Sequence, residues 1–109
     1  MSACLKRNLP LLQVLQRSKP AFVKLLLKGA SPELTKALCE CALNILKGNV
    51  KISASQKKKL SRYKKHLRLL VKKKTSLKKR KQLLQKGGFI GALLTPVLSV
   101  LGSLLSGTR

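Results

Sequence analysis

The chain has 109 residues, and its 25 lysines and arginines face only two acids, Glu33 and Glu40, so its formal net charge is +23. A chain this basic repels itself unless a polyanion, such as nucleic acid or an anionic membrane surface, neutralises it. Two acids and one histidine, His66, leave no acid–base pair or metal-ligand cluster for catalysis. We therefore predict one domain that is no enzyme and takes no cofactor or metal, and whose fold oligomerisation or a bound polyanion helps to complete.

The composition is rich in leucine and poor in aromatic residues, which favours an all-α fold. Charge divides it into a small helical cluster at 1–48, a long polybasic helix at 49–86 and an apolar helical tail at 87–109. In the first segment, Pro20 and Gly29 separate a short second helix from a first one around Pro10 to Arg17.

The third helix has the clearest boundaries. Ser31 is expected to cap its N-terminus, with Pro32 at the first helical position and Glu33 in the first turn. Gly48 is expected to end it. Its apolar residues recur at spacings of three and four and predict one buried stripe: Leu34, Ala37, Leu38, Cys41, Ile45 and Leu46.

The three cysteines, Cys4, Cys39 and Cys41, do not indicate a disulfide framework. Their number is odd, and Cys39 and Cys41 lie too close on one helix to pair with each other. We expect small, buried or half-buried thiols in a reducing compartment.

In the middle segment, Asn49–Ala54 is expected to connect to a long helix that runs from Gln56 towards Gln85, with Ser53 or Ser55 as its cap. Leucines and one tyrosine recur along it in a heptad-like seam: Leu60, Tyr63, Leu67, Leu70, Leu77 and Leu84. Because Lys74 and Lys81 occupy two expected seam positions, a stable coiled coil is not predicted.

This segment carries 15 cations and no acid between Lys57 and Lys86. Like charges four residues apart weaken a free helix, so we expect the chain to be partly disordered without its partner and phosphates to favour helicity. Lysine is a point charge suited to phosphate contacts, which favours double-stranded DNA bound without sequence preference. The predicted contact residues are Lys57, Lys58, Lys59, Arg62, Lys64, Lys65, Arg68, Lys72, Lys73, Lys74, Lys78, Lys79, Arg80, Lys81 and Lys86.

From Gly87 to Gly107 the tail has no charge, and Pro96 with several glycines makes it a weak transmembrane candidate. Three alternatives stay open: the tail folds back on the N-terminal helices, enters a membrane surface, or docks on a partner protein. The candidate docking residues are Phe89, Ile90, Leu93, Leu94, Val97, Leu98, Leu101, Leu104 and Leu105.

A polybasic block that ends in Gly-Gly and continues into an apolar, proline-containing tail resembles the adenovirus late core protein precursor family (protein X, the precursor of mu), and more closely its counterparts in adintoviruses and Maverick/Polinton elements. The similarity covers about Lys57 to Gly107 and rests on Lys78–Lys81, Gln85–Gly91 and Leu94–Gly102.

The resemblance implies a virion core protein that condenses double-stranded DNA in the host nucleus and in the capsid, with capsid proteins as neighbours. It also implies cleavage by a maturation protease near Gly87, Gly88 or Gly91. Two alternatives remain for the whole chain. One is a membrane-active amphipathic protein, in which the lysines gather anionic lipids and the tail inserts. The other is an RNA-binding protein of the ribosomal or nucleolar type.

Overall fold

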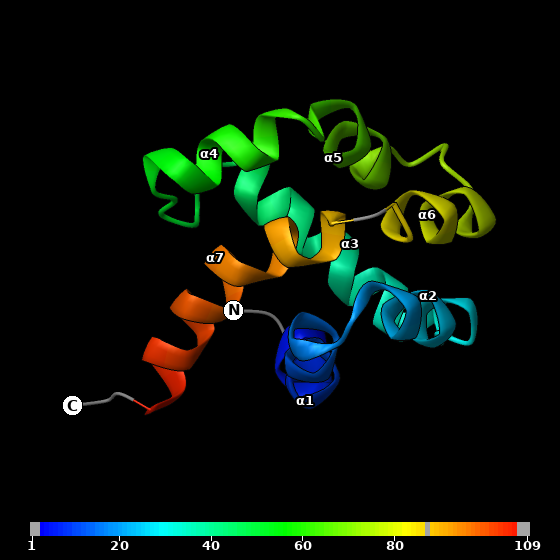
Figure 1. The fold of residues 1–109 in the computed structure, drawn as a ribbon, viewed down its shortest axis with the longest axis horizontal. Helices are drawn as coiled ribbons and strands as arrows, with labels where there is room; N and C mark the ends of the chain where they lie inside the picture. Colours follow the sequence, from blue (N-terminus) through cyan, green and yellow to red (C-terminus); the bar gives the residue numbers. More distant parts are fainter. Residues whose placement is uncertain (1–2, 87, 107–109) are drawn as a thin grey trace.

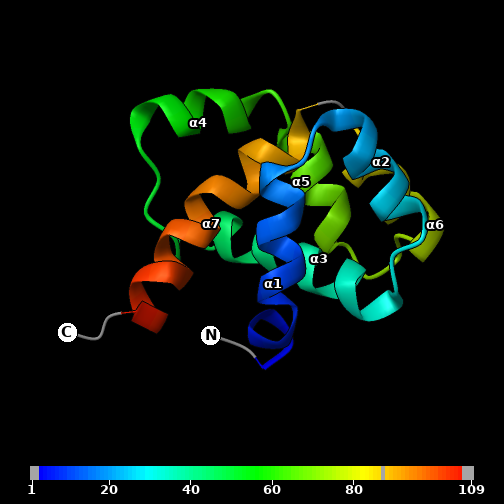
Figure 2. The ribbon, with the colours of Figure 1, turned by 60° about the horizontal axis from the view of Figure 1, so that its bottom comes forward.

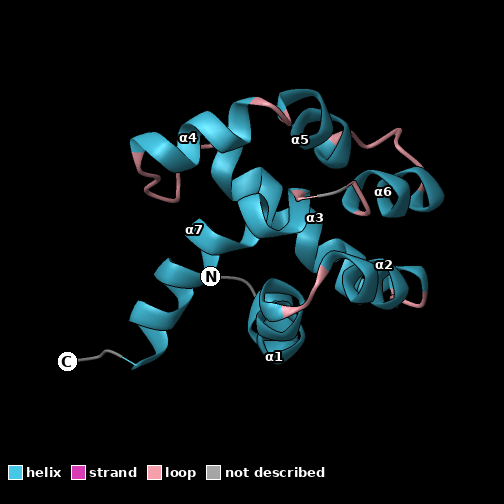
Figure 3. Cartoon of the chain, in the orientation of Figure 1, coloured by secondary structure: helices cyan, strands magenta, loops and turns pink. Residues whose placement is uncertain are grey.

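The computed structural model describes residues 3–86 and 88–106, with side chains through Val100. Within these residues every regular element is an α-helix, which confirms the all-α prediction (Figures 1 and 3). The helices are α1 (Ala3–Arg17), α2 (Pro20–Lys28), α3 (Pro32–Leu46), α4 (Ala54–Ser61), α5 (Lys64–Val71), α6 (Leu77–Leu84) and α7 (Phe89–Ser106).

Helix α1 begins earlier than predicted, at Ala3, and continues through Pro10. A start around Pro10 is expected from sequence because proline usually ends or opens a helix. Here the proline ring lies on the exposed side. The buried side keeps a regular apolar spacing across it, formed by Cys4, Leu5, Leu12 and Leu15.

Helix α3 is the centre of the fold, and its predicted ends are confirmed. The Ser31 hydroxyl accepts a hydrogen bond from the Leu34 amide at 3.1 Å, and Gly48 follows the helix with φ of 78°. Helices α1, α5, α6 and α7 all pack against α3, on more than one of its faces (Figure 2). This explains why burial extends beyond the predicted stripe to Thr35, Cys39 and Ala42, whereas Leu46 at its C-terminal end is exposed.

The prediction of one long basic helix from Gln56 towards Gln85 is wrong, because the segment is divided into α4, α5 and α6. The chain turns at Tyr63 (φ −113°, ψ 21°) and again at Lys72, which is extended (φ −74°, ψ 130°). A continuous helix would stack like charges at every turn. The breaks instead allow leucines of all three helices to reach one core: Leu60, Leu67, Leu70, Leu83 and Leu84.

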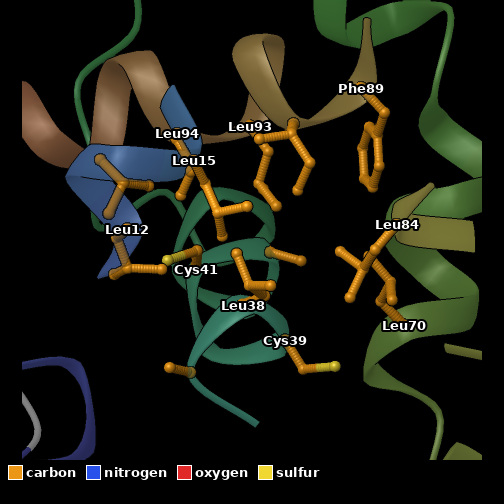
Figure 4. Packing of buried hydrophobic residues seen from close by; sticks show 14 of the residues in the cluster. Leu12, Leu15, Leu38, Cys39, Cys41, Leu70, Leu84, Phe89, Leu93 and Leu94 are labelled. Carbon is orange, nitrogen blue, oxygen red and sulfur yellow. The ribbon is translucent and has the colours of Figure 1, made fainter. Parts of the chain in front are cut away.

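The tail completes this core. The first part of α7 packs against α1, α3 and α4, so the alternative in which the tail folds back is the one that the structure shows for Phe89–Val97. Figure 4 shows leucines of α1, α3, α5 and α6 around the α7 side chains Phe89, Leu93 and Leu94. The radius of gyration, 13.0 Å, is that expected for one folded domain of this length.

Candidate nucleic-acid interface

Helices α4, α5 and α6 carry the basic surface, defined here as the 15 cations from Lys57 to Lys86. In Figure 1, α4 and α5 lie along one side of α3, and α1 lies on another. All of these cations are exposed except Arg80 and Lys81, which are half-buried. In the part of the chain that the structure describes, none of them is paired with a carboxylate; Glu33 forms an ion pair with Arg7 of α1 instead. The basic surface is therefore available to a polyanion.

Helix α4 is held at its start by a capping box. The Ser53 hydroxyl accepts from the Gln56 amide at 3.2 Å, and the Gln56 side-chain oxygen accepts from the Ser53 amide at 2.9 Å. Of the two expected caps, the structure therefore uses Ser53. Leu60 is the one buried residue of α4, so the lysines around it point outwards.

Helix α5 has the same division between a buried and a charged face. Leu67 and Leu70 are buried, while Lys64, Lys65 and Arg68 are exposed. The seam predicted from leucine spacing thus lies on the core side here, although its residues are divided among three helices instead of lying on one. At the start of α6, Leu77 departs from it, with 43% of its surface exposed.

Arg80 has a structural partner that the local sequence does not indicate. Its Nη2 donates to the backbone oxygen of Lys72 at 2.7 Å and so ties α6 to the end of α5. The Ser76 hydroxyl caps α6 by accepting from the Lys79 amide at 3.1 Å. A serine just before a leucine-containing segment was the available sequence signal for this second break.

His66 lies in a small aromatic cluster where α5 meets α7. Its ring centroid is 5.8 Å from that of Tyr63 and 5.7 Å from that of Phe89. Burial lowers the pKa of His66 below 6.5, and the positive charges of Lys86 and Lys79 lower it further. The neutral ring is therefore the form that fits this cluster.

The three thiols are free and buried, as expected. Burial raises the pKa of Cys41 to about 12. Burial also raises the pKa of Cys39, and the charge of Arg80 partly opposes this. Across the described residues, no three His, Cys, Asp or Glu side chains come together as metal ligands would.

Those predicted docking residues of the tail whose side chains the structure describes do not form a free surface. Phe89, Ile90, Leu93, Leu94 and Val97 are buried, and Leu98 is half-buried, because α1 and α3 cover this face of α7. The side chains of Leu101, Leu104 and Leu105 lie outside the described residues. Among the described helices none is long and apolar enough to span a bilayer alone; α6 and α7 pass such a test only as a pair, bent by 90°.

Of the candidate cleavage positions, Gly87 lies outside the described residues. Gly88 is exposed, with φ of 79°. A Cβ atom at this position would lie 3.1 Å from the Tyr63 hydroxyl oxygen, so both backbone conformation and space favour glycine. Gly91 lies in the first turn of α7 and is also exposed.

Comparisons with known protein families, with curated proteins and with solved structures find no match for this chain.

Proposed function

We propose that this protein binds double-stranded DNA without sequence preference and condenses it by neutralising phosphates. The observation that carries this proposal is the basic surface: 15 cations without an intervening acid, nearly all of them exposed on α4, α5 and α6. Lysines predominate, and they contact phosphates as point charges more readily than they read base edges. The protein acts by binding, without a catalytic step.

The resemblance to the adenoviral late core precursors also supports a location for this activity. It supports a protein of the virion core that enters the host nucleus with the DNA and has capsid proteins as neighbours. Genes for a capsid protein, a protein-primed polymerase or a cysteine maturation protease beside this gene would support that placement. Cleavage next to Gly88 would cut the chain between α6 and α7, at an exposed position.

The test is a titration of duplex DNA at several salt concentrations. Each phosphate contact releases condensed counterions, so with about ten contacts the affinity should fall by three to five orders of magnitude between about 50 and 200 mM salt. Two duplexes of unrelated sequence should give the same curve. A salt slope near zero, or a strong preference between the duplexes, would contradict the proposal.

A pair of triple variants tests whether the basic surface, and not total charge alone, makes the contacts. Lys64→Gln, Lys65→Gln and Arg68→Gln remove three charges from α5, and the matched control removes three exposed charges from another side of α3: Lys6→Gln, Arg17→Gln and Lys19→Gln. The α5 variant should reduce the salt slope by about 2–3, and the control by less than about 1. Equal reductions would place the interface elsewhere.

Competition at fixed salt separates DNA from RNA. We expect duplex DNA to displace a labelled duplex at least as well as structured RNA does. Clear preference for the RNA would replace this proposal with the ribosomal or nucleolar alternative.

A further inference from the structure

A cavity of about 400 Å³ opens between α4 and the first turns of α7. Its size falls within the range of natural small-ligand sites, about 300–1,000 Å³. One wall comes from α4 and the turn after it, and the other comes from Gly88 and α7. The lining residues are Gln56, Lys59, Arg62, Tyr63, Gly88, Gly91, Ala92 and Thr95.

The charge of this cavity is positive and local. Lys59 and Arg62 are three residues apart at the end of α4, so both can face the same space. No carboxylate is among the lining residues. The Gln56 side-chain oxygen is already used in the capping box, which leaves its NH₂ group to donate to a ligand. These groups are all hydrogen-bond donors, and they match an anion with several acceptor oxygens.

On the α7 side the cavity is open at Gly91, which has no side chain to fill it. Gly91 does not have a positive φ, so its backbone conformation does not require glycine. A Cβ atom there would meet nothing within 4 Å. The side chain's absence leaves empty space beside the two cations.

From this arrangement we propose that the cavity binds a phosphomonoester, the group found in a free nucleotide and at the phosphorylated end of a DNA strand. Near neutral pH a monoester carries about −1.5 to −2 charges and three terminal oxygens. It therefore matches two cations in one concave site better than a backbone diester, which carries one charge. Lys59 and Arg62 also belong to the basic surface, but binding in the cavity does not require the protein to condense DNA.

The test uses adenosine monophosphate as the probe, titrated into the full chain by calorimetry at about 0.3 M salt, where interactions between distant exposed charges are screened. Two double variants remove the same charge from the same helix and its end. Lys59→Gln with Arg62→Gln should weaken binding about tenfold or more, since it removes two charge-assisted contacts. Lys57→Gln with Lys58→Gln, outside the cavity lining, should change binding by less than about twofold.

A third variant fills the cavity without changing the charge. Ala92 lines it and is only half-buried, so Ala92→Leu should abolish nucleotide binding while circular dichroism shows the wild-type helix content. Equal losses in the two double variants, or wild-type binding by a folded Ala92→Leu protein, would overturn the proposal. Absence of binding by the wild-type chain would do the same.

Duplexes with and without a 5′-phosphate identify the source of the ligand. If only the phosphorylated duplex displaces the nucleotide, the site holds strand ends; if neither does, it holds free nucleotides. Failure of the wild-type chain to bind any duplex would refute the proposed function, while the nucleotide titration would still decide this site.

Discussion

Arg80 differs from its neighbours on the basic surface because its guanidinium group already has a protein partner, the backbone oxygen of Lys72. Hydrogen bonds from charged donors contribute about 1.5–3 kcal/mol. Because the side chain is only half-buried, we expect Arg80→Ala to lower the free energy of unfolding by about 1–2 kcal/mol in urea titrations. Lys79→Ala removes an exposed charge from the same helix and should have no such cost. Equal destabilisation by both substitutions would contradict the structural role of Arg80.

His66 should make the stability depend on pH. Its pKa is lowered in the folded state by burial and by Lys86 and Lys79, so the unfolded chain binds a proton more readily. The associated stability is fully present above about pH 6.5 and is lost as the pH falls through the lower folded-state value. We expect the free energy of unfolding to fall between about pH 7 and pH 5, and to fall less in His66→Gln. Identical pH profiles for the two proteins would rule this out.

At the scale of single elements, the caps hold the short basic helices in place. Ser76 satisfies the Lys79 amide at the start of α6, so Ser76→Ala should lower the free energy of unfolding by about 1 kcal/mol. Ser61 is the matched control, because its hydroxyl donates to the Lys58 carbonyl and does not cap an N-terminus. Ser61→Ala should therefore be neutral or slightly stabilising. Urea unfolding of both variants gives the comparison.

Some helix boundaries can be predicted from the sequence and others cannot, for physical reasons. The boundaries of α3 follow from local chemistry at Ser31, Pro32 and Gly48, and the structure confirms them. The break at Ser76 had a local signal, but the even leucine spacing on both sides of it concealed that signal. The turn at Tyr63 has no cap side chain. It depends on where α7 and Phe89 lie, and local sequence does not contain that information.

At the scale of the whole molecule, the spacing of apolar residues in the uncharged tail does not determine which surface the tail packs against. The same α7 face would suit a lipid surface, a partner groove or the protein's own core, because burial of apolar area is not directional. The choice is made by the apolar faces of α1 and α3, which are brought together only in the folded protein. The cavity beside α4 likewise could not be predicted from the sequence. Lys59 and Arg62 are visible there, but the opposite wall belongs to α7, which approaches them only in the folded protein.

This packing makes the fold depend on α7, whereas the charges that would bind DNA lie outside it. Phe89 is fully buried, and Phe89→Ala should cost about 3–5 kcal/mol, a large part of the stability of a small domain. Ser99→Ala, an exposed change in the same helix, should cost less than about 0.5 kcal/mol. Thermal unfolding followed by circular dichroism measures both.

The same pair of variants separates the two activities considered for this chain. Low-salt DNA binding should survive Phe89→Ala, because the 15 cations of the basic surface are untouched and phosphate neutralisation needs little fixed geometry. Leakage of anionic vesicles should increase, since a loosened α7 exposes apolar side chains that the native core covers. Equal leakage by wild type and Phe89→Ala would show that the covered face of α7 plays no part in membrane contact. Loss of low-salt DNA binding would show that the basic surface acts only when the fold arranges it.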